Sequence, residues 1–322
     1  MWRHAPCGRL RSKQTPVDEF GISRRYFTRD AGQPGVVVGV GDDGALLEPT
    51  PGLLQVQVID TLVEGTHFHS NMDAADVGYR VVAVNLSDIA AMGATPRWMT
   101  LALTLWDKDE RWVERFASGL FAAASEYDVA LVGGDTTAGD AVVASIHMTG
   151  EVEPGKALLR SGAQVGDTIY VTGTVGDAAA GLHLLEDTDG DDFLLRRFLR
   201  PGARVGKGRE LSGRAHGAID VSDGLVGDLR KMLDASGVGA EVEVDQVPLS
   251  AALRARFDAD AALGFAMTGG DDYELCFTAR PEAIGGIEDV TAIGTIVEGR
   301  DLVCRRGGTV VEFDDRGYRH FV

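Results

Sequence analysis

Short apolar runs and amphipathic segments alternate along the chain, and this alternation predicts a mixed α/β protein. Apolar runs rich in β-branched residues predict strands over 36–40, 53–59, 130–132, 142–152, 169–172, 218–221 and 275–278. Apolar residues at helical spacing predict helices over 73–93, 110–127, 177–185 and 225–237, with a further helical stretch after Pro201. An acidic run over 187–192 predicts a loop.

The pattern restarts near Pro154-Gly155, which predicts a boundary between two domains. A chain of 322 residues is also too long for one ordinary hydrophobic core. We expect residues 1–17 to form a basic, disordered extension, residues 18–155 an N-terminal domain, and residues 156–322 a C-terminal α/β domain.

The chain is acidic, and its charge restricts what it binds. Lysine and arginine number 31 against 49 acidic residues, so the net charge is −18. Nucleic acids and anionic membranes attract cationic faces, so the charge excludes both as partners.

The apolar runs are far shorter than the roughly 18 residues of a membrane span. We expect no signal peptide, because the N-terminus lacks an apolar run. Three widely spaced cysteines complete a composition typical of the reducing cytoplasm.

Five places in the sequence share one design, in which an apolar segment ends at a turn that carries aspartate. They are Gly41-Asp42-Asp43, Ile59-Asp60-Thr61, Ser87-Asp88, Gly133-Gly134-Asp135 and Asp220-Val221-Ser222-Asp223. Any one of them indicates no more than a turn, since aspartate and glycine are the usual turn residues. Their recurrence at five segment ends favours a common function for the carboxylates.

Asp88 lies on the apolar stripe of its predicted helix. Val77, Val81 and Val84 mark that stripe, and Asp88 follows four residues after Val84. A carboxylate that faces a core costs on the order of several kcal/mol unless it is paired or bound to a metal. A buried salt bridge to an arginine and a metal ligand are therefore both open, and the other aspartates favour the metal.

Oxygen ligands without histidine or cysteine select a hard cation, Mg²⁺ or Ca²⁺. The sequence has no EF-hand loop, and Mg²⁺ held by carboxylates normally bridges substrate phosphates, so we predict ATP chemistry. The chain lacks a P-loop, a kinase-type His-Arg-Asp and a Gly-x-Gly-x-x-Gly motif. Arg160, beside the predicted domain junction, is the candidate for phosphate binding, with a surface ion pair as the alternative.

Over residues 18–322 the chain resembles the thiamine-monophosphate kinase family in the order and spacing of its motifs. The motifs that carry the resemblance are Val40-Gly41-Asp42-Asp43, Ile59-Asp60-Thr61 with Glu64-Gly65-Thr66-His67-Phe68, Asn85-Leu86-Ser87-Asp88, Gly133-Gly134-Asp135-Thr136-Thr137, Leu159-Arg160-Ser161-Gly162, Asp220-Val221-Ser222-Asp223-Gly224-Leu225, Gly269-Gly270-Asp271-Asp272-Tyr273-Glu274-Leu275 and Gly317-Tyr318-Arg319-His320-Phe321. The last two are more specific to the kinase, whereas the Asn-Leu-Ser-Asp, Gly-Gly-Asp-Thr and Asp-x-Ser-Asp-Gly-Leu motifs belong to the wider aminoimidazole-ribonucleotide synthetase-like superfamily.

The resemblance implies a fold and a reaction. The fold is the two-domain α/β (α+β) fold of that superfamily, with an N-terminal mixed sheet that forms a barrel across a homodimer and a nucleotide cleft between the domains. The reaction is direct, in-line transfer of the γ-phosphoryl group of ATP to thiamine monophosphate on a site with several Mg²⁺ ions, giving thiamine diphosphate and ADP.

The resemblance also implies site residues, position by position. Those matched to Mg²⁺ ligands are Asp43, Asp60, Asp88, Asp135, Asp220 and Asp223, of which Asp43, Asp88, Asp135 and Asp223 form the catalytic set. Those matched to ATP contacts are Gly134, Asp135, Arg160 and Ser222. Those matched to thiamine phosphate contacts are His67, Asp271 and Tyr318.

The chain departs from the family at two places. Val58-Ile59 stands where the family often has Ser-Thr, which removes side-chain hydroxyl ligands. Asp271 replaces the more usual glutamate and shortens its reach by about 1.5 Å, so the contact is direct, through water, or made by Asp272. The acceptor is itself a phosphate with a second pKa of about 6, so the reaction requires no strong general base.

Two alternatives stay open. One is another ATP-dependent enzyme of the superfamily, such as the purine cyclo-ligase, selenophosphate synthetase or the hydrogenase-maturation dehydratase. The absence of a terminal cysteine after His320-Phe321-Val322 disfavours the dehydratase, and the setting of Cys7 disfavours selenium chemistry. The other is an inactive Mg-nucleotide-binding homologue, which the Val58-Ile59 departure favours.

Overall fold

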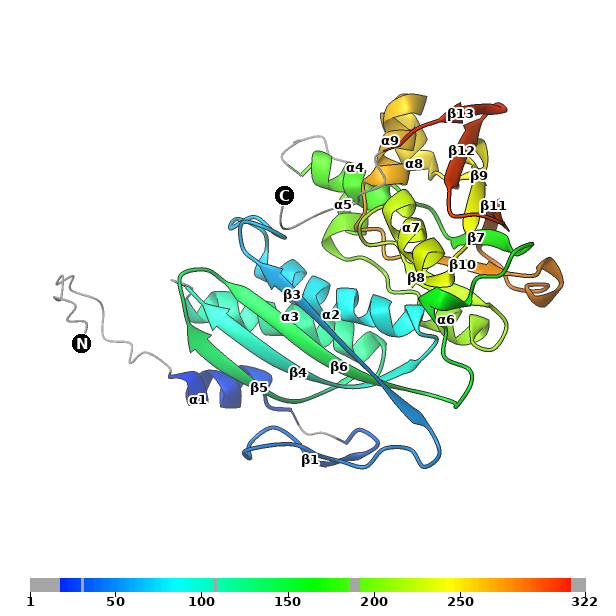
Figure 1. Cartoon of the computed structure of the whole chain (residues 1–322). Coiled ribbons are helices and arrows are strands. Elements are labelled where there is room, and N and C mark those ends of the chain that lie inside the picture. The colour runs from blue at the N-terminus through cyan, green and yellow to red at the C-terminus, as the bar shows by residue number, and fades with distance from the viewer. Residues whose placement is uncertain (1–17, 30–31, 107–108, 186–191, 314–322) are drawn as a thin grey trace, which may run out of the picture.

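The computed structural model describes residues 18–29, 32–106, 109–185 and 192–313, which form two α/β units in contact with each other (Figure 1). The strands up to residue 152 form the sheets of one unit, and those from residue 168 onward form the sheet of the other. The predicted extension and Tyr318 lie outside the described residues.

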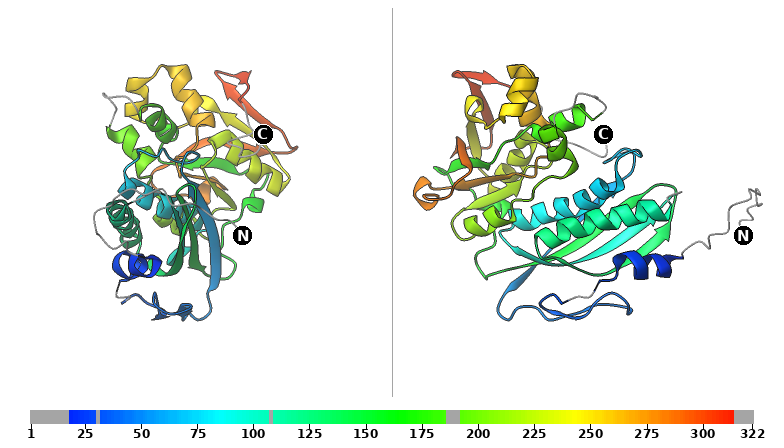
Figure 2. Two further views of the ribbon diagram at one scale, coloured as in Figure 1. Left: turned by 90° about the vertical axis from the view of Figure 1, so that its left-hand side faces the viewer. Right: turned by 180° about the vertical axis from the view of Figure 1, so that it is seen from behind.

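The N-terminal unit is a four-stranded sheet with two long helices on one face, as two opposite views show (Figures 1 and 2). The strand order is β3-β6-β4-β5, with β4 and β5 parallel and the other neighbours antiparallel, so the predicted mixed sheet is confirmed. Its strands are β3 (Leu54–Val63), β4 (Thr95–Leu105), β5 (Ala130–Ala138) and β6 (Val143–Val152). Its helices are α2 (Ala74–Ala91) and α3 (Glu110–Glu126).

Both helices begin where their capping residues dictate. The Asp73 side chain accepts a hydrogen bond from the backbone N–H of Ala75, and Asp109 does the same for Trp112. Gly93 then takes a left-handed conformation with φ +67° just after α2, which ends the helix as predicted.

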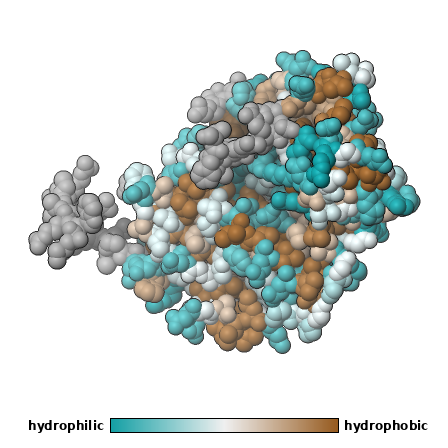
Figure 3. All heavy atoms as spheres, in the orientation of Figure 1, coloured by the Kyte–Doolittle hydropathy of each residue, from teal (hydrophilic) through white to brown (hydrophobic). Residues whose placement is uncertain are grey.

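A small hairpin covers part of the other face of the sheet. It consists of β1 (Val36–Val38) and β2 (Leu46–Leu47), preceded by α1 (Glu19–Ile22) and a π-helical turn (Ser23–Phe27). The hairpin packs its apolar residues on Trp98, Ala130 and Val132. The rest of this face is open, and Figure 3, seen from this side, shows apolar residues at the surface.

The C-terminal unit contains a seven-stranded sheet in the order β13-β12-β9-β11-β7-β10-β8. Its strands are β7 (Thr168–Thr172), β8 (Gly217–Asp220), β9 (Gly239–Glu243), β10 (Leu275–Ala279), β11 (Val290–Val297), β12 (Leu302–Arg306) and β13 (Thr309–Val311). Its helices are α4 (Asp177–His183), α5 (Asp192–Leu199), α6 (Val205–Leu211), α7 (Leu225–Ser236), α8 (Ala251–Arg256) and α9 (Ala259–Thr268). Short 3₁₀ turns occupy Arg160–Gly162, Val244–Gln246 and Pro281–Ala283.

Two of the five predicted aspartate turns are wrong, whereas Asp88 lies within α2, as its predicted helix over 73–93 placed it. Asp60 lies inside β3, because that strand pairs with β6 along its whole length from Leu54 to Val63. Gly134 and Asp135 lie inside β5, which stays paired to β4 up to Ala138. Hydrogen bonding to a neighbouring element therefore carries these segments past the residues that signalled a turn.

The predicted acidic loop at 187–192 is wrong at its last residue, since Asp192 begins α5. Residues 186–191 lie outside the described ranges. From Phe193 onward the apolar residues recur at helical spacing, and the acidic run just before them gave no sign that a helix begins there.

Helix α2 packs against both units and lies in the core that they share. Fifteen of its residues are buried, far more than one face of a surface helix supplies. The apolar core around it is continuous from Val81 and Leu86 to Leu275 and Phe277 of the C-terminal sheet. No helix in the described ranges is long and apolar enough to cross a membrane.

Candidate active site

Four of the predicted aspartates meet where the two units face each other. Asp60 comes from β3, Asp88 from the last turn of α2, Asp220 from the end of β8, and Asp223 from the turn before α7. Asp60 experiences the charges of Asp220 and Asp223, and Asp88 that of Asp60. The fold thus brings residues far apart in the sequence into one acidic cluster.

The Asn-Leu-Ser-Asp segment of α2 connects this cluster in a single helical turn. The backbone N–H of Asp60 donates to Asn85 Oδ1 at 3.0 Å, which fixes β3 against the helix. The Ser87 hydroxyl donates to Asp220 Oδ2 at 2.8 Å, which ties the other unit to the same helix. Asn85 and Ser87 are fully buried, so these bonds are shielded from water. Asp88 follows Ser87 directly in the sequence, so the same turn of α2 also supplies a carboxylate of the cluster.

The clustered carboxylates are harder to ionise than ordinary aspartates. Burial, with the charges of Asp220 and Asp223, raises the pKa of Asp60 to about 6. Burial and the Asp60 charge raise the pKa of Asp88 to about 7, while Arg160 opposes the shift. Burial and the Asp88 charge raise the pKa of Asp220 to about 7 as well. Each raised pKa means that the ionised carboxylate is disfavoured in its surroundings, first by burial and then by the neighbouring carboxylates.

Two cations of the described residues, Arg160 and Lys231, lie next to the cluster. The Arg160 charge lowers the pKa of both Asp88 and Asp220, so its guanidinium belongs to this site. Lys231 contacts Asp223 and donates to Asp228 Oδ1 at 2.8 Å. Asp88 forms no ion pair with any residue that the structure describes, so the buried salt bridge considered from the sequence is not formed.

The loop that carries Asp271 is bonded directly to the loop that carries Ser222. The backbone N–H of Asp271 donates to the Ser222 carbonyl at 2.9 Å, and that of Tyr273 donates to the Val221 carbonyl at 2.9 Å. Asp271 therefore lies beside the acidic cluster. The adjacent Asp272 is fully buried and accepts from the backbone of Gly176, so it is not open to a ligand. Of the two, only Asp271 remains available for the predicted substrate contact.

Asp43 and Asp135 are placed elsewhere. Asp43 follows the small hairpin strand β1 and is exposed. Asp135 lies opposite Ala102 on the sheet face away from the helices, whereas Asp60 lies opposite the buried Ile146 on the helical face. Three strand spacings of about 4.8 Å separate β5 from β3. One chain therefore does not bring Asp135 to the other four aspartates.

Gly134 occupies its position because no side chain fits there. A Cβ at Gly134 would lie 2.1 Å from the backbone oxygen of Leu101 on the adjacent strand. His67 lies in the loop after β3, where its Nδ1 accepts the backbone N–H of Val63 at 3.1 Å. These contacts account for both residues locally, and their assigned ligand roles stay predictions, as does that of Tyr318.

The donor set of the cluster is suited to a hard cation. Its donors are carboxylate and hydroxyl oxygens, and the raised pKa values show that the ionised carboxylates are disfavoured there, which a divalent cation would offset. Within the described part of the chain, however, no three His, Cys, Asp or Glu side chains are close enough together to hold one ion. The donor atoms fit Mg²⁺ in their chemistry, although the described side chains do not enclose an ion as they stand.

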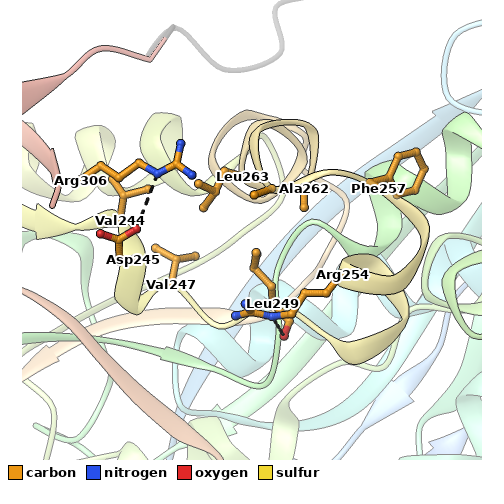
Figure 4. Close-up of a pocket in the computed structure, with 10 residues that line it drawn as sticks. Val244, Asp245, Val247, Leu249, Arg254, Phe257, Ala262, Leu263 and Arg306 are labelled. Atoms are coloured by element: carbon orange, nitrogen blue, oxygen red, sulfur yellow. Dashed lines mark hydrogen bonds and ion pairs between the residues drawn. The ribbon is translucent and has the colours of Figure 1, made fainter.

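Two cavities of the described residues lie away from the cluster. One of 290 Å³ is at the far end of the C-terminal unit, between apolar residues such as Val247 and Leu263 and the arginines Arg254 and Arg306 (Figure 4). The other, of 550 Å³, lies between β6 and α6. None of the predicted site residues lines either cavity.

Sequence reasoning missed several residues that organise the site. Asn85 and Ser87 were recognised as parts of a motif, but the groups they bind were not apparent. Arg80 is 2% exposed and belongs to the same helix. A charged residue between Val77 and Val81 was the signal that could have identified it, because such a residue on a buried helix needs a partner.

The chain matches the family model of AIR synthase related proteins in both halves. The model of the N-terminal domain matches residues 41–152, and that of the C-terminal domain matches residues 164–306. The thiamine-monophosphate kinase of Salmonella typhimurium is 47% identical over 325 residues, covering 94% of this chain and 98% of the relative. That of Bacillus subtilis is 33% identical over 328 residues, covering 95% and 100%.

Solved structures resemble the fold over most of its length. The thiamine-monophosphate kinase of Stenotrophomonas maltophilia K279a has a TM-score of 0.80 at 42% identity, covering 90% of this chain and 95% of that one. A structure described as "AaThiL complexed with AMPPCP and TMP" has a TM-score of 0.78 at 32% identity, covering 97% and 99%. The hydrogenase maturation protein HypE in complex with ATP, at 19% identity and a TM-score of 0.70, shares the fold alone.

Proposed function

The chain belongs to the thiamine-monophosphate kinases among the AIR synthase related proteins, and from this membership we propose that it phosphorylates thiamine monophosphate with ATP to give thiamine diphosphate and ADP. A phosphate oxygen of the acceptor attacks the γ-phosphorus of ATP in line. The bond between that phosphorus and the β,γ-bridging oxygen breaks, and ADP leaves. The single observation that carries the proposal is the cluster of four aspartates between the two units, beside Arg160.

The residues of the cluster have different roles in bringing the ATP phosphates and the acceptor phosphate together. Arg160 binds ATP phosphate oxygens, and Ser222 contacts the nucleotide from the adjacent loop. Asp60, Asp88, Asp220 and Asp223 would hold Mg²⁺, which supplies neutralisation of the phosphate charges when bound. The acceptor phosphate is already largely ionised near neutral pH, so the reaction requires no strong general base.

We expect ADP release from ATP and Mg²⁺ only when thiamine monophosphate is present. Free thiamine has no phosphate to accept the group, and water is a competing acceptor that a closed site excludes. A coupled assay for ADP should therefore give turnover with thiamine monophosphate and background rates with thiamine or with no acceptor. Turnover with free thiamine, or tight Mg-ATP binding without turnover, would instead favour a different enzyme of the family or an inactive homologue.

We also propose that the chain is a homodimer whose second copy completes the site. Asp135 lies on β5, and the cluster residue Asp60 lies on β3, at opposite edges of the same sheet. Within the described residues both outer edges lack a paired strand, and the open face carries the exposed Ile59. A partner that places its β5 next to this β3 joins the two sheets and brings the strand that carries its own Asp135 beside the strand that carries Asp60.

Mixed dimers test this arrangement. Asp88→Asn and Asp135→Asn are each expected to be nearly inactive, because each removes one carboxylate from every site. If Asp135 acts across the dimer, a one-to-one mixture that has exchanged subunits regains about a quarter of the parent activity, since half of the dimers then contain one intact site. A monomeric mass in sedimentation, or a mixture as inactive as its components, would contradict the proposal.

A further inference from the structure

Arg80 is a buried cation that reaches from α2 into the C-terminal unit. Its Nη2 donates to Asp271 Oδ1 at 2.5 Å, and its other terminal nitrogen contacts the carbonyl of Phe198. The guanidinium lies 4.4 Å from the ring centre of Phe198 and 5.8 Å from that of Tyr273. Its Nε is buried and has no hydrogen-bond partner among the residues that the structure describes.

Asp271 is held in a single geometry by these contacts. The Tyr273 hydroxyl donates to the same oxygen, Oδ1, at 3.1 Å. Asp271 and Tyr273 both have a left-handed backbone, with φ of 62° and 53°, which non-glycine residues adopt only when their surroundings impose it. The Asp271 N–H is bonded to the Ser222 carbonyl at 2.9 Å, so main chain and side chain are both fixed.

The second carboxylate oxygen of Asp271 is the free one. Within the described residues Oδ2 accepts no hydrogen bond, and the Asp271 side chain is 30% exposed. A free carboxylate oxygen repels phosphate and attracts a cation or an N–H donor. The cationic, amino-bearing organic part of thiamine monophosphate has both features, and its phosphate has neither.

We infer that Arg80 and Tyr273 are positioning residues that hold Asp271 Oδ1, so that Oδ2 faces the organic part of the acceptor. The inference rests on the proposed function and adds two residues to it. It follows that loss of either donor weakens acceptor binding and leaves nucleotide binding unchanged, because Arg160 and Ser222 serve the nucleotide.

The test compares Tyr273→Phe and Arg80→Lys with a matched control. Tyr273→Phe removes one hydroxyl and preserves the packing ring, and Arg80→Lys preserves the charge but not the paired geometry. Asp76→Asn is the control, since Asp76 also joins α2 to the C-terminal unit, through Arg200, at 2.6 Å. The Michaelis constants for thiamine monophosphate and ATP are measured separately, and unfolding temperatures are recorded for each variant.

We expect both variants to raise the Michaelis constant for thiamine monophosphate by about 3- to 10-fold, the range for the net contribution of one ordinary hydrogen bond, because the lost bond positions Asp271 and does not itself contact the substrate. The constant for ATP should stay within about twofold, and Asp76→Asn should change neither. Folded variants with unchanged constants, or equal changes for both substrates, overturn the inference alone, as does an equal effect of Asp76→Asn. If Arg80→Lys fails to fold, Tyr273→Phe decides. A parent that neither binds nor uses thiamine monophosphate rejects the proposed function and this inference with it.

Discussion

Asp88→Asn is expected to lower kcat/KM by about 100- to 1000-fold in the presence of Mg²⁺ while the protein remains folded. This loss is comparable to the removal of one preorganised group from an active site. The physical reason is the position of Asp88 between Asp60 and Asp220, where burial and the neighbouring charge raise its pKa to about 7. Asparagine retains the shape of the side chain but supplies no charge to a cation. The variant is checked by steady-state kinetics and by circular dichroism.

Asp76→Asn is the matched control for this substitution. Asp76 is also on α2, three turns earlier, and its partner Arg200 is near the surface. Both changes replace a carboxylate by an amide on the same helix, so a general effect on α2 would appear in both variants. If Asp88→Asn unfolds the protein and removal of Mg²⁺ has no effect on the parent, Asp88 is a structural residue and the metal interpretation fails.

The helices of the fold could be predicted from the sequence because local signals determine them. The caps at Asp73 and Asp109 fix where α2 and α3 begin, and Gly237 ends α7 in a left-handed conformation. The strand ends at Asp60 and Asp135 could not be predicted, because they depend on how far the neighbouring strand continues.

The aspartates of the site could be selected from the sequence, but their grouping could not. Asp88 was chosen because its helix stripe is apolar, yet the structure places it half-buried at a charged boundary rather than in the core. Asp135 follows the same turn-like signal as Asp223, and only the strand register shows that it faces the other side of the sheet. Arg80 gave no motif at all, because its partner Asp271 lies 191 residues away in the sequence.

The metal-free protein is expected to lose stability as the pH rises from about 4 to about 8, and Mg²⁺ is expected to reverse much of that loss. Asp60, Asp88 and Asp220 have folded-state pKa values of about 6, 7 and 7, all above the unfolded value near 4. Between these limits the folded state binds more protons than the unfolded state, so the free energy of unfolding falls as protons leave. Below about pH 4 the three groups are protonated in both states, so they no longer contribute to the pH dependence of the free energy of unfolding.

Comparison with Asp88→Asn isolates this effect from the rest of the acidic surface. In EDTA at pH 8 the variant is expected to melt at least about 2 °C above the parent, because it removes one charge from the repelling set, and the difference should vanish below about pH 4. In saturating Mg²⁺ at pH 8 the order should reverse, since the parent binds the ion and the variant has lost a ligand. Differential scanning calorimetry at the two pH values, with and without Mg²⁺, gives all four comparisons. A parent that is more stable than Asp88→Asn in EDTA at pH 8, or a Mg²⁺ effect equal in both proteins, would mean that the aspartates are neutralised within the protein and do not hold a cation.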